Sequence, residues 1–133
     1  MVRKAIKISE STCGTIAIYV DQINAAEILA FLNKDKRHQK KFNYIQEIIF
    51  GRFRMPEVYD KEEINQQCKG VTAMKFFKGQ ENARLYCKEI TTEDSVFVVI
   101  TSELLGRKKS TKLTKKDRQL IKKVASYEYT LEE

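Results

Sequence analysis

The chain has 133 residues, a formal net charge of +7 and a sequence pI of about 9.3. Its 42% of hydrophobic residues, with one Pro and five Gly, is the composition of one globular domain over residues 1–133 and excludes a disordered chain. No stretch is apolar over the length of a membrane span or a signal-peptide core, so the sequence predicts a soluble, cytoplasmic protein with acidic partners.

The first half of the chain predicts a strand followed by helices. β-branched residues alternate with smaller ones over residues 14–20, which is typical of a strand. Asn24 and Glu27 have the spacing of a helix-capping pair, so a helix should begin there. Two apolar stripes follow, ended by Gly51, and predict two helices or one bent helix over 25–50: Ile28, Leu29 and Leu32, then Phe42, Ile45, Ile48 and Ile49.

The second half predicts three strands and a final helix. Residues 59–70 have room for one or two helical turns. Strands are expected at 71–77, 83–90 and 96–101, joined by the short polar loops KGQEN and TTEDS as an antiparallel meander, with the last strand central and covered on both sides. Thr114 and Asp117 predict a helix N-terminus, and a helix over 115–128 buries one face: Leu120, Ile121, Val124 and Tyr127.

This order of elements predicts an α+β fold. We expect a mostly antiparallel sheet, formed by the N-terminal strand and the three-stranded meander, with two N-terminal helices and one C-terminal helix.

Cysteine and histidine limit the chemistry. Cys13, Cys68 and Cys87 are widely spaced without a C-x-x-C pair, and His38 is the sole histidine. This pattern excludes a histidine-rich metal site and argues against a disulfide framework. We therefore expect reduced thiols, no metal and no cofactor.

Positive charge is concentrated in two segments. Residues 34–54 hold seven Lys/Arg and two acids, and residues 107–123 hold nine Lys/Arg and one acid. Such segregation allows a basic face that binds phosphates by releasing counterions, although lysine-rich helices are often only solvated surfaces.

Several motifs carry a resemblance to a known family. They are GRFRMPE (51–57), Lys75 in AMKFF, Arg84 in ARLYCKEI, and VFVVITSELLGRKKSTKLTKKD (96–117), in which an apolar strand leads through paired lysines into a helix. The chain resembles the RelE/HigB-like toxins of type II toxin–antitoxin pairs, a part of the RelE/ParE superfamily that includes phage-derived Gp49-like proteins. Lys75 stands at a strand position where that family favours Arg.

The resemblance implies a RelE/ParE toxin-like fold and a metal-independent endoribonuclease that cuts messenger RNA, often on the ribosome, and so inhibits translation. Its implied partners are mRNA, the ribosome with its rRNA and a cognate antitoxin. Lys, Arg and Tyr can supply the base, the phosphate-neutralising cations and the proton donor for such cleavage. Candidate catalytic residues are Lys75, Arg84, Lys109 and Tyr129, and candidate RNA-binding residues are Arg107, Lys108, Lys112, Lys115 and Lys116.

Other readings of these residues remain open. Arg84 could pair with a nearby acid such as Glu89, and Lys75 could protect a sheet edge from aggregation. Tyr127 is expected in the core, and Tyr129 is the better candidate for stacking on a base. At the level of the protein, the alternative is a non-enzymatic binder of the same fold, either a ParE-like topoisomerase inhibitor or an RNA-binding module.

Overall fold

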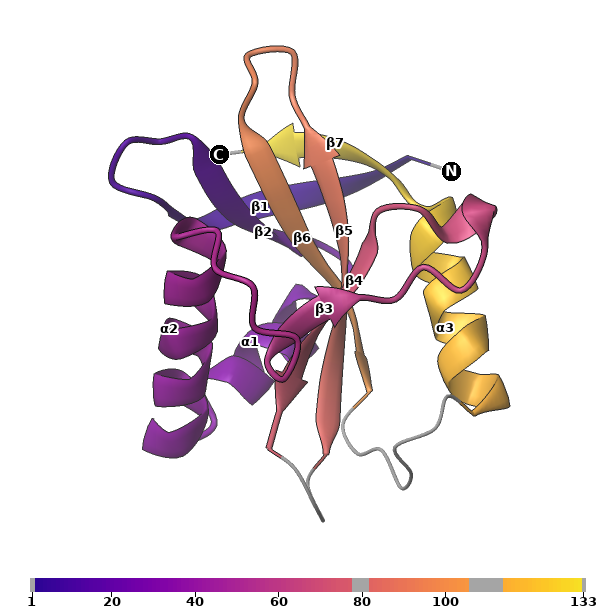
Figure 1. Cartoon of the computed structure of the whole chain (residues 1–133), viewed down its shortest axis with the longest axis horizontal. Helices are drawn as coiled ribbons and strands as arrows, with labels where there is room; N and C mark the ends of the chain where they lie inside the picture. Colours follow the sequence, from indigo (N-terminus) through magenta and orange to yellow (C-terminus); the bar gives the residue numbers. More distant parts are fainter. Residues whose placement is uncertain (1, 78–81, 106–113, 133) are drawn as a thin grey trace.

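The computed structural model describes residues 2–77, 82–105 and 114–132 (Figure 1). The elements, in chain order, are β1 (Val2–Glu10), β2 (Ile16–Asp21), α1 (Ala25–Leu32), α2 (Lys36–Phe50), β3 (Tyr59–Lys61), the short 3-10 helix η1 (Gln66–Cys68), β4 (Val71–Phe76), β5 (Ala83–Thr91), β6 (Phe97–Leu105), α3 (Lys115–Ser126) and β7 (Glu128–Glu132).

The described strands form one mixed sheet with the order β3-β4-β5-β6-β2-β1-β7. β4, β5 and β6 pair antiparallel as a meander, whereas β2 pairs parallel to β6 and β1 pairs parallel to β7. The predicted RelE/ParE-like, mostly antiparallel sheet is therefore wrong. Three strands that the sequence analysis did not expect, β1, β3 and β7, extend the sheet to seven, and the two parallel pairings make it mixed.

Helices cover both faces of the sheet, with α1 and α2 on one side and α3 on the other (Figure 1). Alternate residues of β4 show the division, because Met74 and Phe76 pack with α1 and α2, whereas Val71 and Ala73 pack with α3. β6 is the central strand, and Val98, Val99 and Ile100 are fully buried as predicted. The parts of the sheet that remain accessible are thus its edges and the ends of its strands.

The helix ends follow local side-chain signals. Thr114 and Asp117 form a capping box at the start of α3, where the sequence predicts a helix N-terminus. Asn24 is the N-cap residue of α1 but its side chain makes no capping bond, because its amide donates to the carbonyl of Ser102 instead. Asp35, which the sequence analysis did not single out, caps α2 by accepting from the backbone N–H of His38. None of the helices in the described ranges is long and apolar enough to span a membrane.

A buried polar network joins the two ends of the chain to the sheet. The carboxylate of Asp21, which is fully buried, accepts hydrogen bonds from Arg3 Nε at 2.6 Å, from Tyr129 Oη at 2.7 Å and from the backbone N–H groups of Ile23 and Asn24. The network explains why β7 forms, since Tyr129 in β7 and Arg3 in β1 reach the same carboxylate across the parallel pairing.

Candidate functional site

A cavity lies between α2 and the ends of β4 and β5. Its volume is about 800 Å³. It combines basic, aromatic and acidic side chains with the linker that follows α2, and its lining residues are Lys41, Tyr44, Met55, Pro56, Glu57, Val58, Lys75, Phe76, Phe77, Asn82 and Arg84.

Strand register brings Lys75 and Arg84 together. The two residues are direct partners in the antiparallel pairing of β4 and β5, where opposed Cβ atoms are about 5 Å apart. Arg84 also pairs with Leu105, the last residue of β6. The two cations that the sequence analysis named as catalytic candidates thus lie side by side. They alternate along their strands with Phe76 and Leu85 of the α1/α2 face, so their side chains leave the sheet on the α3 face, and both residues contribute to the cavity lining near the strand ends.

Carboxylates of β3 and the residue after it partly neutralise these cations. Lys75 Nζ is 3.9 Å from Asp60 Oδ2, and Arg84 Nη1 is 3.7 Å from Glu62 Oε1. Both distances exceed that of a direct hydrogen bond. Arg84 is only 11% exposed, and its buried Nε has no hydrogen-bond partner among the residues that the structure describes. A buried guanidinium N–H without a partner costs free energy, which an anion in the cavity would recover.

Helix α2 and the linker add the groups that chemistry on a phosphate would use. Lys41 and Tyr44 come from consecutive turns of α2, with Lys41 Nζ 5.8 Å from the centre of the Tyr44 ring. Glu57, from the linker between α2 and β3, places an exposed carboxylate at the same cavity. The cavity therefore holds three cations, a phenol and a carboxylate that can accept a proton.

Lys41, Tyr44 and Glu57 were not predicted as site residues. Lys41 and Tyr44 lie in the basic segment 34–54, where the spacing i, i+3 puts them on one helix face beside the buried stripe. This spacing was the sequence feature from which a shared site for Lys41 and Tyr44 could have been predicted. Glu57 is in the GRFRMPE motif, but nothing local indicates that the linker folds back toward β4; the backbone bond from Lys75 N–H to the Val58 carbonyl provides that contact.

The structure separates Tyr129 from Lys75 and Arg84. Tyr129 lies in β7, at the opposite edge of the sheet from β3, and its hydroxyl bonds to Asp21 and to Ser102. Burial, followed by the nearby Asp21 carboxylate, raises the pKa of Tyr129. These contacts give it a structural role in the buried network, and it does not line the cavity. Tyr127 is buried as expected, and its hydroxyl donates to Glu103.

The remaining predicted residues belong to the segment before α3 and to its first turn. Lys115 and Lys116 are exposed at the start of α3 and do not line the cavity. Four of the predicted residues lie outside the described residues: Arg107, Lys108, Lys109 and Lys112.

The described cysteines are free, and the described residues form no metal site. Cys13 is an exposed free thiol, and Cys68 and Cys87 are buried free thiols. In the three described ranges, no group of three or more His, Cys, Asp or Glu side chains is arranged to hold a metal ion.

Comparisons with protein-family models, with curated proteins and with solved structures find no match to this chain. The resemblance to RelE/HigB-like toxins therefore remains a prediction from short motifs, and the site must be interpreted from its own chemistry.

Proposed function

We propose that the protein is an RNA-binding endoribonuclease that acts without a metal ion, with the scissile phosphate bound between Lys75 and Arg84. The observation that carries the proposal is the pairing of these two cations in adjacent strands at the wall of one cavity, together with Lys41, Tyr44 and Glu57. Two cations on one phosphate stabilise the additional negative charge of a pentacoordinate transition state.

The cavity offers a group for each step of cleavage by the neighbouring ribose. The 2′-oxygen attacks phosphorus while its proton passes to a base, and the bond to the 5′-oxygen breaks as that oxygen receives a proton. The Glu57 carboxylate is the proton acceptor in this scheme, and the Lys41 ammonium or the Tyr44 phenol is the donor. Lys75 and Arg84 neutralise the two non-bridging oxygens. Tyr129 has no part in it.

The cellular role that we propose is that of a toxin of a toxin–antitoxin pair, acting on messenger RNA at the ribosome and held inactive by a cognate antitoxin. Its support is the motif resemblance and the basic character of the chain. Expression in a bacterium should arrest translation, and the product of an adjacent antitoxin gene should restore growth.

A binding module without catalysis is the second candidate, and one observation favours it. Asp60 and Glu62 stand next to the two central cations and lower the positive charge that a transition state would meet. Such a protein would bind RNA and leave it intact.

The test uses the purified full chain and a fluorescent, unstructured RNA in buffer with EDTA. Wild type should bind and cut this RNA, and should bind but not cut the same sequence with 2′-deoxyribose, because the attacking hydroxyl is then missing. Arg84→Ala should slow cleavage by roughly 10²-fold or more while affinity falls far less. Lys41→Ala, at a half-buried position in the middle of α2 where Ala favours the helix, should also slow cleavage.

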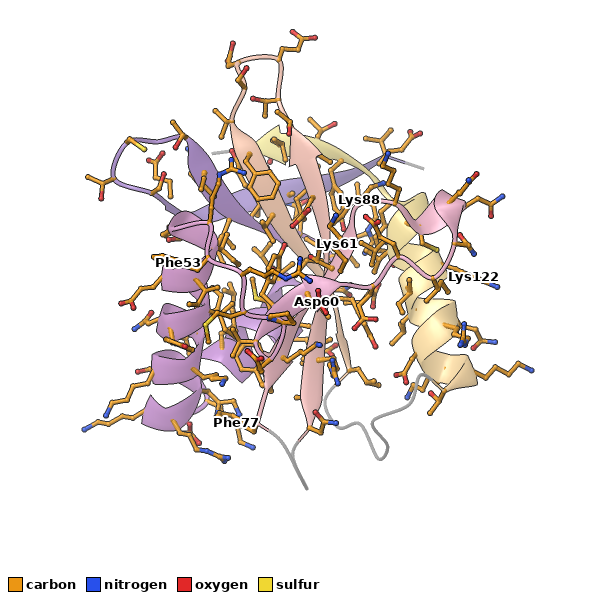
Figure 2. All side chains as sticks on the ribbon, viewed as in Figure 1. Phe53, Asp60, Lys61, Phe77, Lys88 and Lys122 are labelled. Carbon is orange, nitrogen blue, oxygen red and sulfur yellow. The ribbon has the colours of Figure 1, made fainter. Side chains whose placement is uncertain are left out.

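Lys122→Ala is the matched control, since Lys122 is exposed on α3, across the sheet from α2 (Figure 2). It should cut RNA at the wild-type rate. Binding without cleavage under all conditions would favour the binding module, and absence of RNA binding would refute both candidates.

A further inference from the structure

A second cavity continues the site along α2. Its volume is about 540 Å³, and it is lined by Lys36, Arg37, Lys40, Lys41, Tyr44 and Phe77. Lys41, Tyr44 and Phe77 line the first cavity as well. The two cavities therefore form one groove. Tyr44 and Phe77 lie at the junction of its two parts, between the proposed phosphate site at Lys75 and Arg84 and the basic face of α2.

The cations of this groove form a row. Lys36, Lys40 and Tyr44 follow one another at i, i+4 spacing, so they lie on one face of α2 over a length of about 12 Å. Lys36 and Lys40 are exposed. With Arg37 and Lys41, which line the same cavity, they present four cations over about 8 Å of the helix. Several cations in such a short stretch match a polyanion with several phosphates better than a single small anion.

Two aromatic rings, those of Tyr44 and Phe77, line the groove beside these cations. Tyr44 is 40% exposed. Phe77 lies at the end of β4 beside α2 (Figure 2), where the Arg37 guanidinium stands 3.7 Å from its ring centre and the buried His38 ring packs against it at 4.9 Å. Phe77 has a φ of +47°, which is unfavourable for a bulky residue. Backbone strain of this kind is found most often at functional sites, and here it holds an aromatic ring at the groove.

We propose that Tyr44 and the Arg37–Phe77 pair form a base-stacking subsite, so that the groove takes single-stranded RNA with its bases on these rings and its backbone along Lys36, Lys40 and Lys41. Aromatic rings and guanidinium planes bind unpaired bases by stacking, and cations between them bind the phosphates. Paired bases are stacked on each other and are not available to these rings. This inference rests on the proposed function and specifies its substrate class.

The experiment compares three uncleavable probes by fluorescence anisotropy: a 2′-O-methyl oligoadenylate eight nucleotides long, an abasic backbone of the same length, and a duplex of the oligoadenylate with its complement. The single strand should bind wild type at least tenfold more tightly than the abasic backbone or the duplex. Tyr44→Leu should lower affinity for the oligoadenylate about tenfold and leave that for the abasic backbone unchanged. Lys40→Ala should reduce the salt dependence of binding for both single-stranded probes.

Phe53→Leu is the control, because Phe53 is 65% exposed and lines neither cavity. It should bind all probes as wild type does, and circular dichroism should show that each variant is folded. Equal affinity for the oligoadenylate and the abasic backbone, or wild-type affinity in Tyr44→Leu, would overturn the stacking subsite while leaving phosphate binding and cleavage intact. Failure of wild type to bind any probe would overturn the subsite and the proposed function together.

Discussion

Asp21 is the position where a single isosteric change should destabilise the fold most clearly. Its carboxylate is fully buried and is the counter-ion of Arg3, which is only 8% exposed. In Asp21→Asn the amide oxygen can still accept from the backbone, but the Arg3 guanidinium becomes a buried charge without its counter-ion and keeps the contact with the Tyr127 ring. Breaking a buried ion pair in this way costs about 3–5 kcal/mol.

Urea denaturation measures this loss. With an m-value of about 1.5 kcal/mol/M, a loss of about 3 kcal/mol lowers the midpoint by about 2 M. Glu132→Gln is the control, because it removes an exposed ion pair with Lys4 of β1, 3.6 Å apart, between β1 and β7. Its midpoint should shift by less than about 0.5 M.

A second variant separates charge burial from loss of packing. Adding Arg3→Met to Asp21→Asn removes the buried charge, so the double variant should be more stable than Asp21→Asn alone. If Asp21→Asn and Glu132→Gln unfold at the same urea midpoint, the conclusion that the buried network holds β1 and β7 to the sheet is wrong.

Three further predictions concern individual groups. The pKa of Cys13 is lowered to about 7, chiefly by the Thr15 hydroxyl 3.0 Å from its sulfur, so its alkylation by iodoacetamide should rise with a midpoint near pH 7; a midpoint near 8.5 would contradict this. Burial raises the pKa of Glu89, whose contribution to stability is therefore present below about pH 4.3 and lost as pH rises through the folded-state pKa. The melting temperature of Glu89→Gln relative to wild type should accordingly increase between pH 4 and pH 7, and a constant difference would be evidence against this. Thr114→Ala removes the capping box of α3 and should cost about 1 kcal/mol in urea denaturation, whereas an unchanged midpoint would show that the cap contributes nothing.

Local periodicity was enough to predict the elements whose partners are close in sequence. β4, β5 and β6 have alternating or apolar stretches separated by short polar loops, and they pair in sequence order. β1 and β7 gave no such signal, because Arg3 and Lys4 interrupt the apolar pattern of β1 and β7 is only five residues long. Their parallel pairing joins segments that are over 120 residues apart in the sequence. Arg3 can be buried in β1 because the carboxylate of Asp21 neutralises it. Neither fact can be predicted from the sequence of β1 or β7 alone.

The site was predicted only in part, because only some of its residues have partners that are close in the sequence. Lys75 and Arg84 lie in neighbouring strands of the meander, and a short connection makes their opposition plausible from sequence. The contribution of Lys41 and Tyr44 depends on how α2 packs across the end of the sheet, which is a long-range property. Tyr129 was assigned to the site from the family resemblance, and the strand β7 that carries it to the opposite edge of the sheet was not expected.

The measurement that tests the central claim most directly is an NMR titration of the ¹⁵N-labelled full chain with the 2′-O-methyl oligoadenylate. Binding in the groove predicts the largest amide shift changes at residues 36–44, 75–77 and 82–84, with small changes over α3 at 117–126. Changes confined to α3, or no changes at RNA concentrations that saturate nonspecific binders, would contradict the account.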